Sequence, residues 1–377
     1  MKIRNIVKDR RVQAGVILLL AAVAPIFLHT ASLMHIAVLI LLYIILSLGL
    51  EVALGITGLF SLCHAAFYGM GAYVSALLSI YFGLSFWITL PIAAICAGLF
   101  GVLIGLPALR TNGDYLAIAT LGFGEIFRLL LINGGEITRG PRGLPSIPRP
   151  VFFGLDFTNK GTYYYILLFV AVMIFLVVLN IPRTFFGRAL MAIRDDEDAA
   201  AFMGIRTSRY KVCAFAISGL IAGIAGAFYA HYICFISPDT FIYNDSITIL
   251  TMVLIGGSGT VAGPALGAVI LTVLPELLRS FVEYRMLIYG LIVVIMMQLR
   301  PKGILGHVNT RTSYLDSLLG SIRDKKIGGD QQGGSTNDVL RHGRRPVRPQ
   351  HLLHPDSGEG GAPWRWLRPL AAVYHGV

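Results

Sequence analysis

Charged residues are scarce in this sequence. Only 14% of the 377 residues are Asp, Glu, Lys or Arg, whereas 55% are hydrophobic and the mean hydropathy is +0.72. Soluble domains carry about 25% charged residues. The composition therefore excludes an ordinary soluble domain and indicates an integral membrane protein.

Motifs for disulfides, metals and catalysis are also missing. No C-x-x-C spacing occurs among the four cysteines, which lie in or beside apolar runs: Cys63, Cys96, Cys213 and Cys234. There is no G-x-x-x-x-G-K-S/T phosphate loop, and GGSGTVAG at 256–263 lacks the lysine that would hold phosphates. A nucleophile elbow and an H-E-x-x-H motif are absent as well. We therefore predict no catalytic residue, no metal and no cofactor in this chain.

Long apolar runs are what the sequence does contain. A helix needs about 20 apolar residues to cross a bilayer, and nine runs approach or exceed that length: 13–31, 33–50, 62–82, 86–109, 114–132, 163–181, 210–235, 247–279 and 284–299. The first lacks a cleavage site followed by a polar domain, so we expect a retained span. We predict an all-α, polytopic helical bundle of about 8–10 spans, some of them broken or re-entrant.

Basic residues exceed acidic ones by 31 to 20, which gives a formal net charge of +11. No basic module interleaved with aromatics is present, so nucleic acid is not an expected partner. Short cytoplasmic loops collect Lys and Arg, and this predicts that Arg110, the 183–211 cluster and both termini are cytoplasmic. The loop 133–160 then lies outside and violates the rule, because placing it inside would displace the denser 183–211 cluster.

Glycines interrupt two apolar stretches, LGITGLFSLCHAAFYGMGAY at 54–73 and LIGGSGTVAGPALGAVIL at 254–271. Glycine weakens a helix interior, and Pro264 suits a first helical position, so we expect a break in each. Paired breaks point to the binding path of a transporter. The candidate pathway residues in these stretches are Gly55, Gly58, His64, Gly69, Gly71, Gly256, Gly257 and Gly263. The alternative is that the glycines only allow close helix packing.

Few ionisable residues fall inside the apolar runs. Glu125 and Arg128 are three apart, so either they pair on one helix face or Glu125 lines the pathway. Both readings stay open. His64 and His231 are isolated and are expected to pack in the core. We expect water to reach Glu51, near a helix end.

One short stretch, AIRDDEDAAAFMGI at 192–205, is rich in acidic residues. Asp195 suits an N-cap, the next three acids suit the first turn of a helix, and Gly204 suits its end. Phe202 and Met203 form an apolar tip. Helices that lie on membranes usually carry basic residues, so docking to a protein partner is the expected role.

Five segments together resemble LivM-type permease subunits of branched-chain amino acid ABC importers: 58–73, 109–130, 186–205, 252–279 and 284–306. The resemblance implies a type II-like importer permease that moves Leu, Ile or Val across the bacterial inner membrane. It also implies that 186–205 contains the coupling helix that meets the ATPase, with Arg188, Arg194, Asp195, Glu197, Asp198, Ala200 and Gly204 as its candidate residues. Cys63 departs from the family pattern, which generally has glycine there.

The partners implied are two ABC ATPase subunits that bind ATP and Mg²⁺, a LivH-like second permease, a periplasmic substrate-binding protein and membrane lipid. The outer loop 133–160 is expected to help dock the substrate-binding protein. Alternatives are a permease of the same architecture for a sugar, urea or short amide, or, from other classes, a channel or an intramembrane enzyme. Residues 1–306 form the predicted permease domain, and 307–377, rich in Gly, Arg and Pro, a cytoplasmic tail without a stable fold.

Overall fold

The computed structural model describes residues 30–108, 113–152, 155–156, 160–277, 290–291, 293–294, 298 and 303–305. Nearly all of the predicted span at 13–31 and of the run at 284–299 lies outside these residues, as do Arg110 and the tail at 307–377. The division into a permease domain and a tail therefore stays a prediction.

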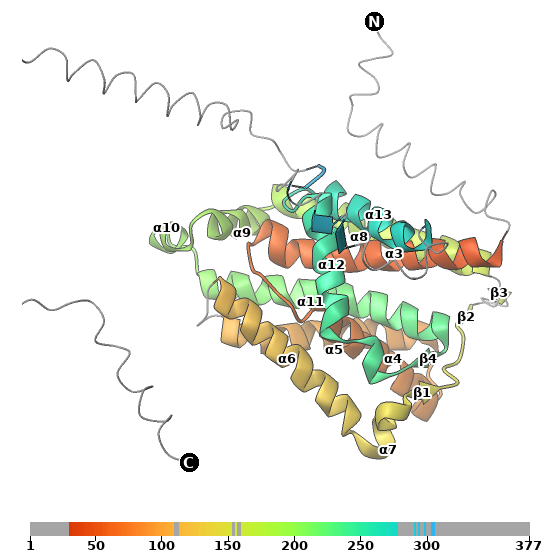
Figure 1. The fold of residues 1–377 in the computed structure, drawn as a ribbon. Helices are drawn as coiled ribbons and strands as arrows, with labels where there is room; N and C mark the ends of the chain where they lie inside the picture. Colours follow the sequence, from red (N-terminus) through yellow and green to blue (C-terminus); the bar gives the residue numbers. More distant parts are fainter. Residues whose placement is uncertain are drawn as a thin grey trace, which may run out of the picture. The chain divides into compact units, whose positions relative to one another are not determined.

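Helices account for nearly all of the described secondary structure (Figure 1). The longer helices are α3 (Ala31–Glu51), α4 (His64–Phe82), α5 (Phe86–Ala108), α6 (Asp114–Ile132), α8 (Lys160–Asn180), α9 (Phe185–Asp195), α11 (Thr207–Ile233), α12 (Tyr243–Gly256) and α13 (Ala262–Leu277). The short helices are η1 (Val52–Ile56), α7 (Gly135–Thr138), η2 (Gly140–Arg142), η3 (Ile181–Arg183), α10 (Glu197–Phe202) and η4 (Pro238–Thr240).

Two small antiparallel ladders connect the loops. Strand β1 (Leu144–Pro145) pairs with β4 (Phe235–Ile236), with Leu144 opposite Ile236. Strand β2 (Val151–Phe152) pairs with β3 (Leu155–Asp156). The strands and α7 lie at one end of the long helices, and α9 and α10 lie at the other (Figure 1).

Six helices in the described part of the chain are long and apolar enough to cross a membrane. They are Ser32–Ile56, His64–Phe82, Phe86–Leu106, Tyr115–Ile132, Lys160–Arg183 and Thr207–Ile233. This confirms the predicted polytopic helical fold. The apolar run at 247–279 is not one span, because α12 and α13 divide it.

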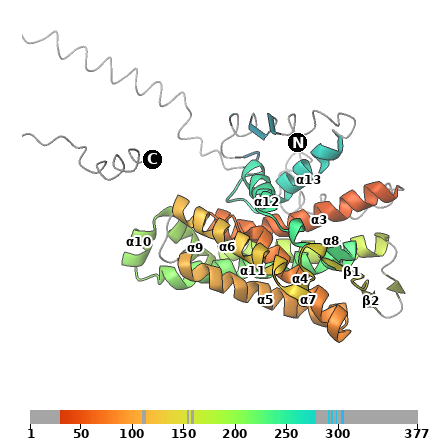
Figure 2. The same ribbon diagram turned by 60° about the horizontal axis from the view of Figure 1, so that its bottom comes forward.

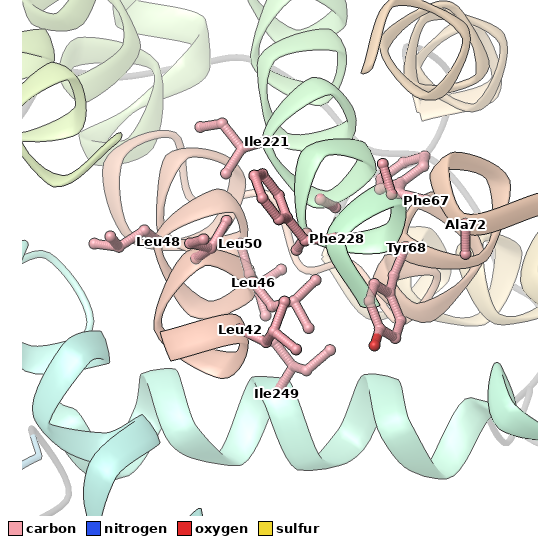
Figure 3. Packing of buried hydrophobic residues seen from close by; sticks show 14 of the residues in the cluster. Leu42, Leu46, Leu48, Leu50, Phe67, Tyr68, Ala72, Ile221, Phe228 and Ile249 are labelled. Atoms are coloured by element: carbon pink, nitrogen blue, oxygen red, sulfur yellow. The ribbon is translucent and has the colours of Figure 1, made fainter. Parts of the chain in front are cut away.

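Helix α11 packs along α3, α4 and α5 (Figure 2). Side chains from α3, α4 and α11 meet in a buried cluster that includes Leu46, Phe67 and Phe228, and Ile249 joins it from α12 (Figure 3). Apolar burial alone does not drive helices together in lipid, so close packing of small residues is needed. A Cβ at Gly71 of α4 would overlap the backbone of Gly223 in α11.

The first predicted break lies between α3 and α4. The α-helix widens into the π-turn η1, and residues 57–63 are non-helical before α4 begins at His64. Local π-turns occur often at functional sites. Gly69 and Gly71 lie inside α4, beyond the break, and a Cβ at Gly69 would press on Phe127 and Phe241. Both glycines make close contacts of the kind that the packing alternative expects, and their place in the pathway stays a prediction.

The second predicted break separates α12 from α13. Gly257 follows the last turn of α12, and α13 starts at Ala262. Pro264 is the third residue of α13 and not the first. It still lies in the first turn, where a missing N–H costs no helical hydrogen bond. Both α12 and α13 pack against α3 (Figure 2).

Candidate functional site

Helix α9 is amphipathic and follows α8 after the short helix η3. Thr184 caps its start, because its side chain accepts a hydrogen bond from the Gly187 N–H at 3.0 Å. Leu190 and Ile193 are buried on its inner face. Arg188 is exposed, donates from Nη1 to the Arg183 carbonyl at 2.9 Å and lies 6.0 Å from the centroid of the Phe185 ring.

Helix α10 begins one residue later than predicted. Asp196 has an extended backbone, with φ −161° and ψ 112°, and its Oδ1 accepts a hydrogen bond from the Ala199 N–H at 2.9 Å. Asp196 is therefore the N-cap, and Asp195 is the last residue of α9. The prediction of Asp195 as N-cap was wrong because the acidic run is divided between two helices. Asp198 is exposed on the first turn of α10.

Gly204 ends α10 in the conformation that its sequence position predicts. Its φ is +84°, a region that glycine adopts at little cost. Its N–H donates to the Ala201 carbonyl at 2.9 Å, and the Ile205 N–H donates to the Ala200 carbonyl at 3.1 Å. This pair of hydrogen bonds is a Schellman motif.

The outer face of α10 presents two apolar side chains. Phe202 is 91% exposed and Met203 is 84% exposed, whereas Ala200 is buried. The expected apolar tip is thus present at the end of α10. Exposed apolar side chains at a helix tip suit insertion into a groove of another protein.

An ion pair that sequence reasoning missed attaches α10 to α11. The Lys211 ammonium lies 2.5 Å from Glu197 Oε2, and its side chain is only 3% exposed. The sequence contains both charges, but Lys211 was treated only as one member of the basic cluster at 183–211 and was not paired with Glu197. Glu197 therefore has a defined structural contact within its own chain.

Arg194 connects α9 to the first break. Its Nη1 donates a hydrogen bond to the Gly55 carbonyl at 2.8 Å, and its Nε and Nη2 donate to Asp195 Oδ1 at 3.3 and 3.2 Å. A Cβ at Gly58 would lie 2.8 Å from Arg194 Cγ. The structure thus brings a candidate coupling residue against two candidate pathway residues.

Glu51 was also misjudged from the sequence. Water does not reach it: the side chain is fully buried at the end of α3, next to Gly55. Its Oε1 accepts a hydrogen bond from the Gly259 N–H at 2.7 Å. We call the group formed by Glu51, Gly55, Arg194 and Gly259 the Glu51 junction, since it joins α3, α9 and the second break.

The remaining glycines of the second break pack against one another. A Cβ at Gly256 would overlap the Gly263 carbonyl, and a Cβ at Gly263 would overlap the Gly257 carbonyl. Close to them, the Ile304 N–H donates to the Ile255 carbonyl at 2.8 Å. The close glycine contacts between residues 256 and 263 hold the end of α12 beside the start of α13.

Three ionisable candidates have partners of their own. His64 is buried, and its Nε2 lies 2.9 Å from the Leu46 carbonyl, so it packs in the core as expected. Glu125 pairs with Arg128 at 2.7 Å, and Arg128 also reaches Asp239 of η4 at 3.2 Å. Pairing on one face is therefore realised, and Arg128 links α6 to η4.

A cavity of about 200 Å³ lies near the start of α8 and the end of α11. His35, Arg149, Lys160 and Tyr232 are among its lining residues. None of the predicted pathway residues lines it. The cavity and the Glu51 junction are separate features of the protein.

Comparisons with known proteins agree with the sequence motifs. The family model "Branched-chain amino acid transport system / permease component" matches residues 32–297. The high-affinity branched-chain amino acid transport system permease protein LivM of Escherichia coli (strain K12) is 42% identical over 313 residues, covering 77% of this chain and 74% of that protein.

More distant relatives extend the comparison. A probable branched-chain amino acid transport permease protein LivM of Methanocaldococcus jannaschii is 27% identical and covers 57% of this chain and 67% of that protein. The autoinducer 2 import system permease protein LsrC of Salmonella typhi is 32% identical and covers 50% of this chain and 56% of that protein. No solved structure matches the chain.

Proposed function

This chain belongs to the family of branched-chain amino acid transport system permease components, and from that premise we propose how it takes part in transport. It is a multi-pass membrane permease subunit and not an enzyme. We propose that it carries leucine, isoleucine and valine inward across the bacterial inner membrane. The observation that carries this proposal is the 42% identity, over 77% of the chain, to a permease named for high-affinity branched-chain amino acid transport.

ATP hydrolysis is assigned to partner chains. The sequence holds no phosphate loop of its own, so ATP and Mg²⁺ are bound by two ABC ATPase subunits. A LivH-like second permease completes the membrane path, and a periplasmic substrate-binding protein delivers the amino acid. The outer loop 133–160 contributes to the docking surface for that protein.

We assign the contact with the ATPase to α9 and α10. Phe202 and Met203 are exposed where a groove of the ATPase would enclose them, and Asp198 of α10 and Arg188 of α9 are exposed as well. With this assignment, we propose that α9 and α10 lie in the cytoplasm and that the loop 133–160 lies outside. In support, α7 and the strands of that loop lie at the opposite end of the helices from α9 and α10 (Figure 1). We propose that both termini lie in the cytoplasm as well.

A second candidate function rests on a specific relative. The LsrC permease, named for autoinducer 2 import, is 32% identical over half of this chain. The architecture therefore serves more than one class of small solute. A polar solute such as a sugar, urea or short amide is the alternative cargo.

Reconstitution tests these proposals. The chain is placed in liposomes with its ATPase subunits, second permease and substrate-binding protein, and uptake of labelled Leu, Ile and Val is measured with and without ATP. We expect ATP-dependent uptake that excess unlabelled isoleucine suppresses and that ribose or urea leaves unchanged. Uptake without ATP would indicate a channel, and suppression by ribose or urea would indicate the alternative cargo.

Labelling tests the orientation. In a chain with all four cysteines replaced, Phe202→Cys should react with a membrane-impermeant maleimide only in inside-out vesicles. Ser146→Cys, in the loop 133–160, should react only in right-side-out vesicles. The reverse pattern would place α10 outside and end its assignment to the ATPase contact.

A further inference from the structure

We propose that Glu51 is a positioning residue for coupling: its carboxylate ties the α12–α13 break to α3 at the point where Arg194 attaches the coupling helix. The inference rests on the proposed function, because it assigns a role within ATP-driven transport. Glu51 is not part of the coupling helix, and Gly259, which it holds, is 208 residues away in sequence.

The position of Glu51 is costly for a carboxylate. The side chain is fully buried at the end of a membrane-spanning helix, where an ionisable group is expensive and usually marks a functional site. An apolar side chain would fill this place at lower cost. Among the described residues, the Gly259 N–H is the hydrogen-bond donor to Oε1, and Oε2 has no protein partner. The carboxylate is therefore directed at the break between α12 and α13.

Arg194 reaches the same junction from the cytoplasmic helix. Its Nη1 donates to the Gly55 carbonyl, one turn after Glu51, and a Cβ at Gly259 would lie 3.3 Å from that same nitrogen. The guanidinium thus lies between the end of α3 and the second break. A displacement of α9 by the ATPase would move the Gly55 carbonyl, and Glu51 would carry that movement to Gly259.

The junction has little free space. A Cβ at Gly55 would overlap the Glu51 carboxylate, and a Cβ at Gly58 would lie 2.8 Å from Arg194 Cγ. Well-packed groups shift together because the interior transmits strain. The contacts Arg194 to Gly55 and Glu51 to Gly259 form one continuous connection from α9 to the turn between α12 and α13.

A competing account is purely structural: Glu51 only satisfies the buried Gly259 N–H. The two accounts differ in what they predict for coupling. A structural role lowers the amount of assembled complex, so uptake and ATP hydrolysis fall in proportion. A positioning role changes the amount of solute moved for each ATP hydrolysed.

The test compares two substitutions of similar volume in the reconstituted complex. Glu51→Gln keeps an oxygen that can accept from Gly259, whereas Glu51→Met fills the space without an acceptor. We expect Glu51→Gln to keep the wild-type uptake per ATP. Glu51→Met should still hydrolyse ATP but should lose roughly fivefold or more of its uptake per ATP, the lower range of typical coupling between sites. Asp239→Asn, at an exposed carboxylate of η4 away from the junction, is the carboxylate control and should leave the ratio unchanged.

A double substitution checks that the two contacts act in series. If Arg194→Met and Glu51→Met interrupt one connection, the uptake per ATP of the double variant should be no lower than that of the more affected single variant. If the fold-loss of uptake per ATP in the double variant equals the product of the two single fold-losses, the two contacts act independently and the single connection is contradicted. Should Glu51→Met fail to assemble, Glu51→Leu, which also lacks an acceptor, is measured for the same ratio and decides between the same two outcomes.

Each result separates this inference from the proposed function. If the wild-type complex shows no ATP-driven uptake, the proposed function fails. If the wild-type complex transports and Glu51→Met keeps its uptake per ATP, only the role of Glu51 is overturned. A proportional fall in uptake and hydrolysis would also overturn it, in favour of the structural account.

Discussion

Replacing Glu197 by Gln should loosen α10 more than replacing Lys211 by Met, although both changes remove the same ion pair. The reason is the unequal burial of the two partners. The Lys211 side chain is 3% exposed, whereas Glu197 is 31% exposed. Each single substitution leaves a different charge behind, and only one of these charges can be hydrated in place.

The magnitudes follow from that difference. Removing one partner of a buried ion pair costs about 3–5 kcal/mol. Glu197→Gln leaves a buried ammonium without this counter-charge, and we take about 3 kcal/mol because the Gln amide oxygen can still accept a hydrogen bond. Lys211→Met leaves a carboxylate that water reaches, so its cost is about 1 kcal/mol or less.

Hydrogen exchange of the α10 amides measures the effect directly. Since about 1.4 kcal/mol corresponds to a tenfold change in an equilibrium constant, Glu197→Gln should speed exchange at Ala200 and Ala201 by about a hundredfold. Lys211→Met should speed it by less than about tenfold. In the double variant the exchange should be slower than in Glu197→Gln, because the buried ammonium of Lys211 has been removed as well.

The control is Asp198→Asn, which removes an exposed acid from the same turn of α10. Its loss affects only the helix dipole, by about 0.3–1 kcal/mol. Faster exchange in Lys211→Met than in Glu197→Gln would refute the reasoning from burial. So would additive effects in the double variant, since they would mean that the two side chains do not interact.

Three further predictions concern other parts of the site. Gly204→Val places a β-branched residue at φ +84°, so we expect α10 to end differently and uptake per ATP to fall in the reconstituted complex; a normal ratio would count against α10 as the ATPase contact. Gly71→Leu should separate α4 from α11, because even a Cβ overlaps Gly223, and the yield of monodisperse protein by size-exclusion chromatography should drop sharply. Gly122→Ala in α6, where nothing lies near the added Cβ, should change the yield little. Arg128→Gln removes an exposed link between α6 and η4, so the thermal unfolding midpoint should fall by no more than a few degrees, consistent with about 1 kcal/mol or less for surface pairs; a large drop would show that the pair carries more of the fold.

Local signals were enough for much of the architecture. Apolar length predicted the spans around α3, α5, α6, α8 and α11, because a helix that crosses lipid must satisfy its own backbone. Gly204 was predicted to end a helix, and the glycines near 256–263 to break one, because backbone freedom is a property of the residue itself. The motifs also predicted the family correctly.

The start of α10 could not be predicted from the neighbouring residues alone. Four consecutive acids allow several caps, and the chain uses Asp196 because α9 remains helical through Asp195. That choice depends on how α9 packs against α11 and η1, which no nearby residue specifies. The error was one residue, yet it moved Asp195 from one helix to another.

The sequence alone determined which segments are apolar enough to cross a lipid bilayer and where two of them break. It also determined which short helix is polar enough to lie in water. Only the tertiary structure decided that Glu51 is buried against Gly259, that Arg194 lies at the same point and that Lys211 meets Glu197. The physical reason is that periodicity and backbone preference are read within one helix, whereas contacts between helices depend on their rotation and depth relative to one another, which are set by the packing of all of them together.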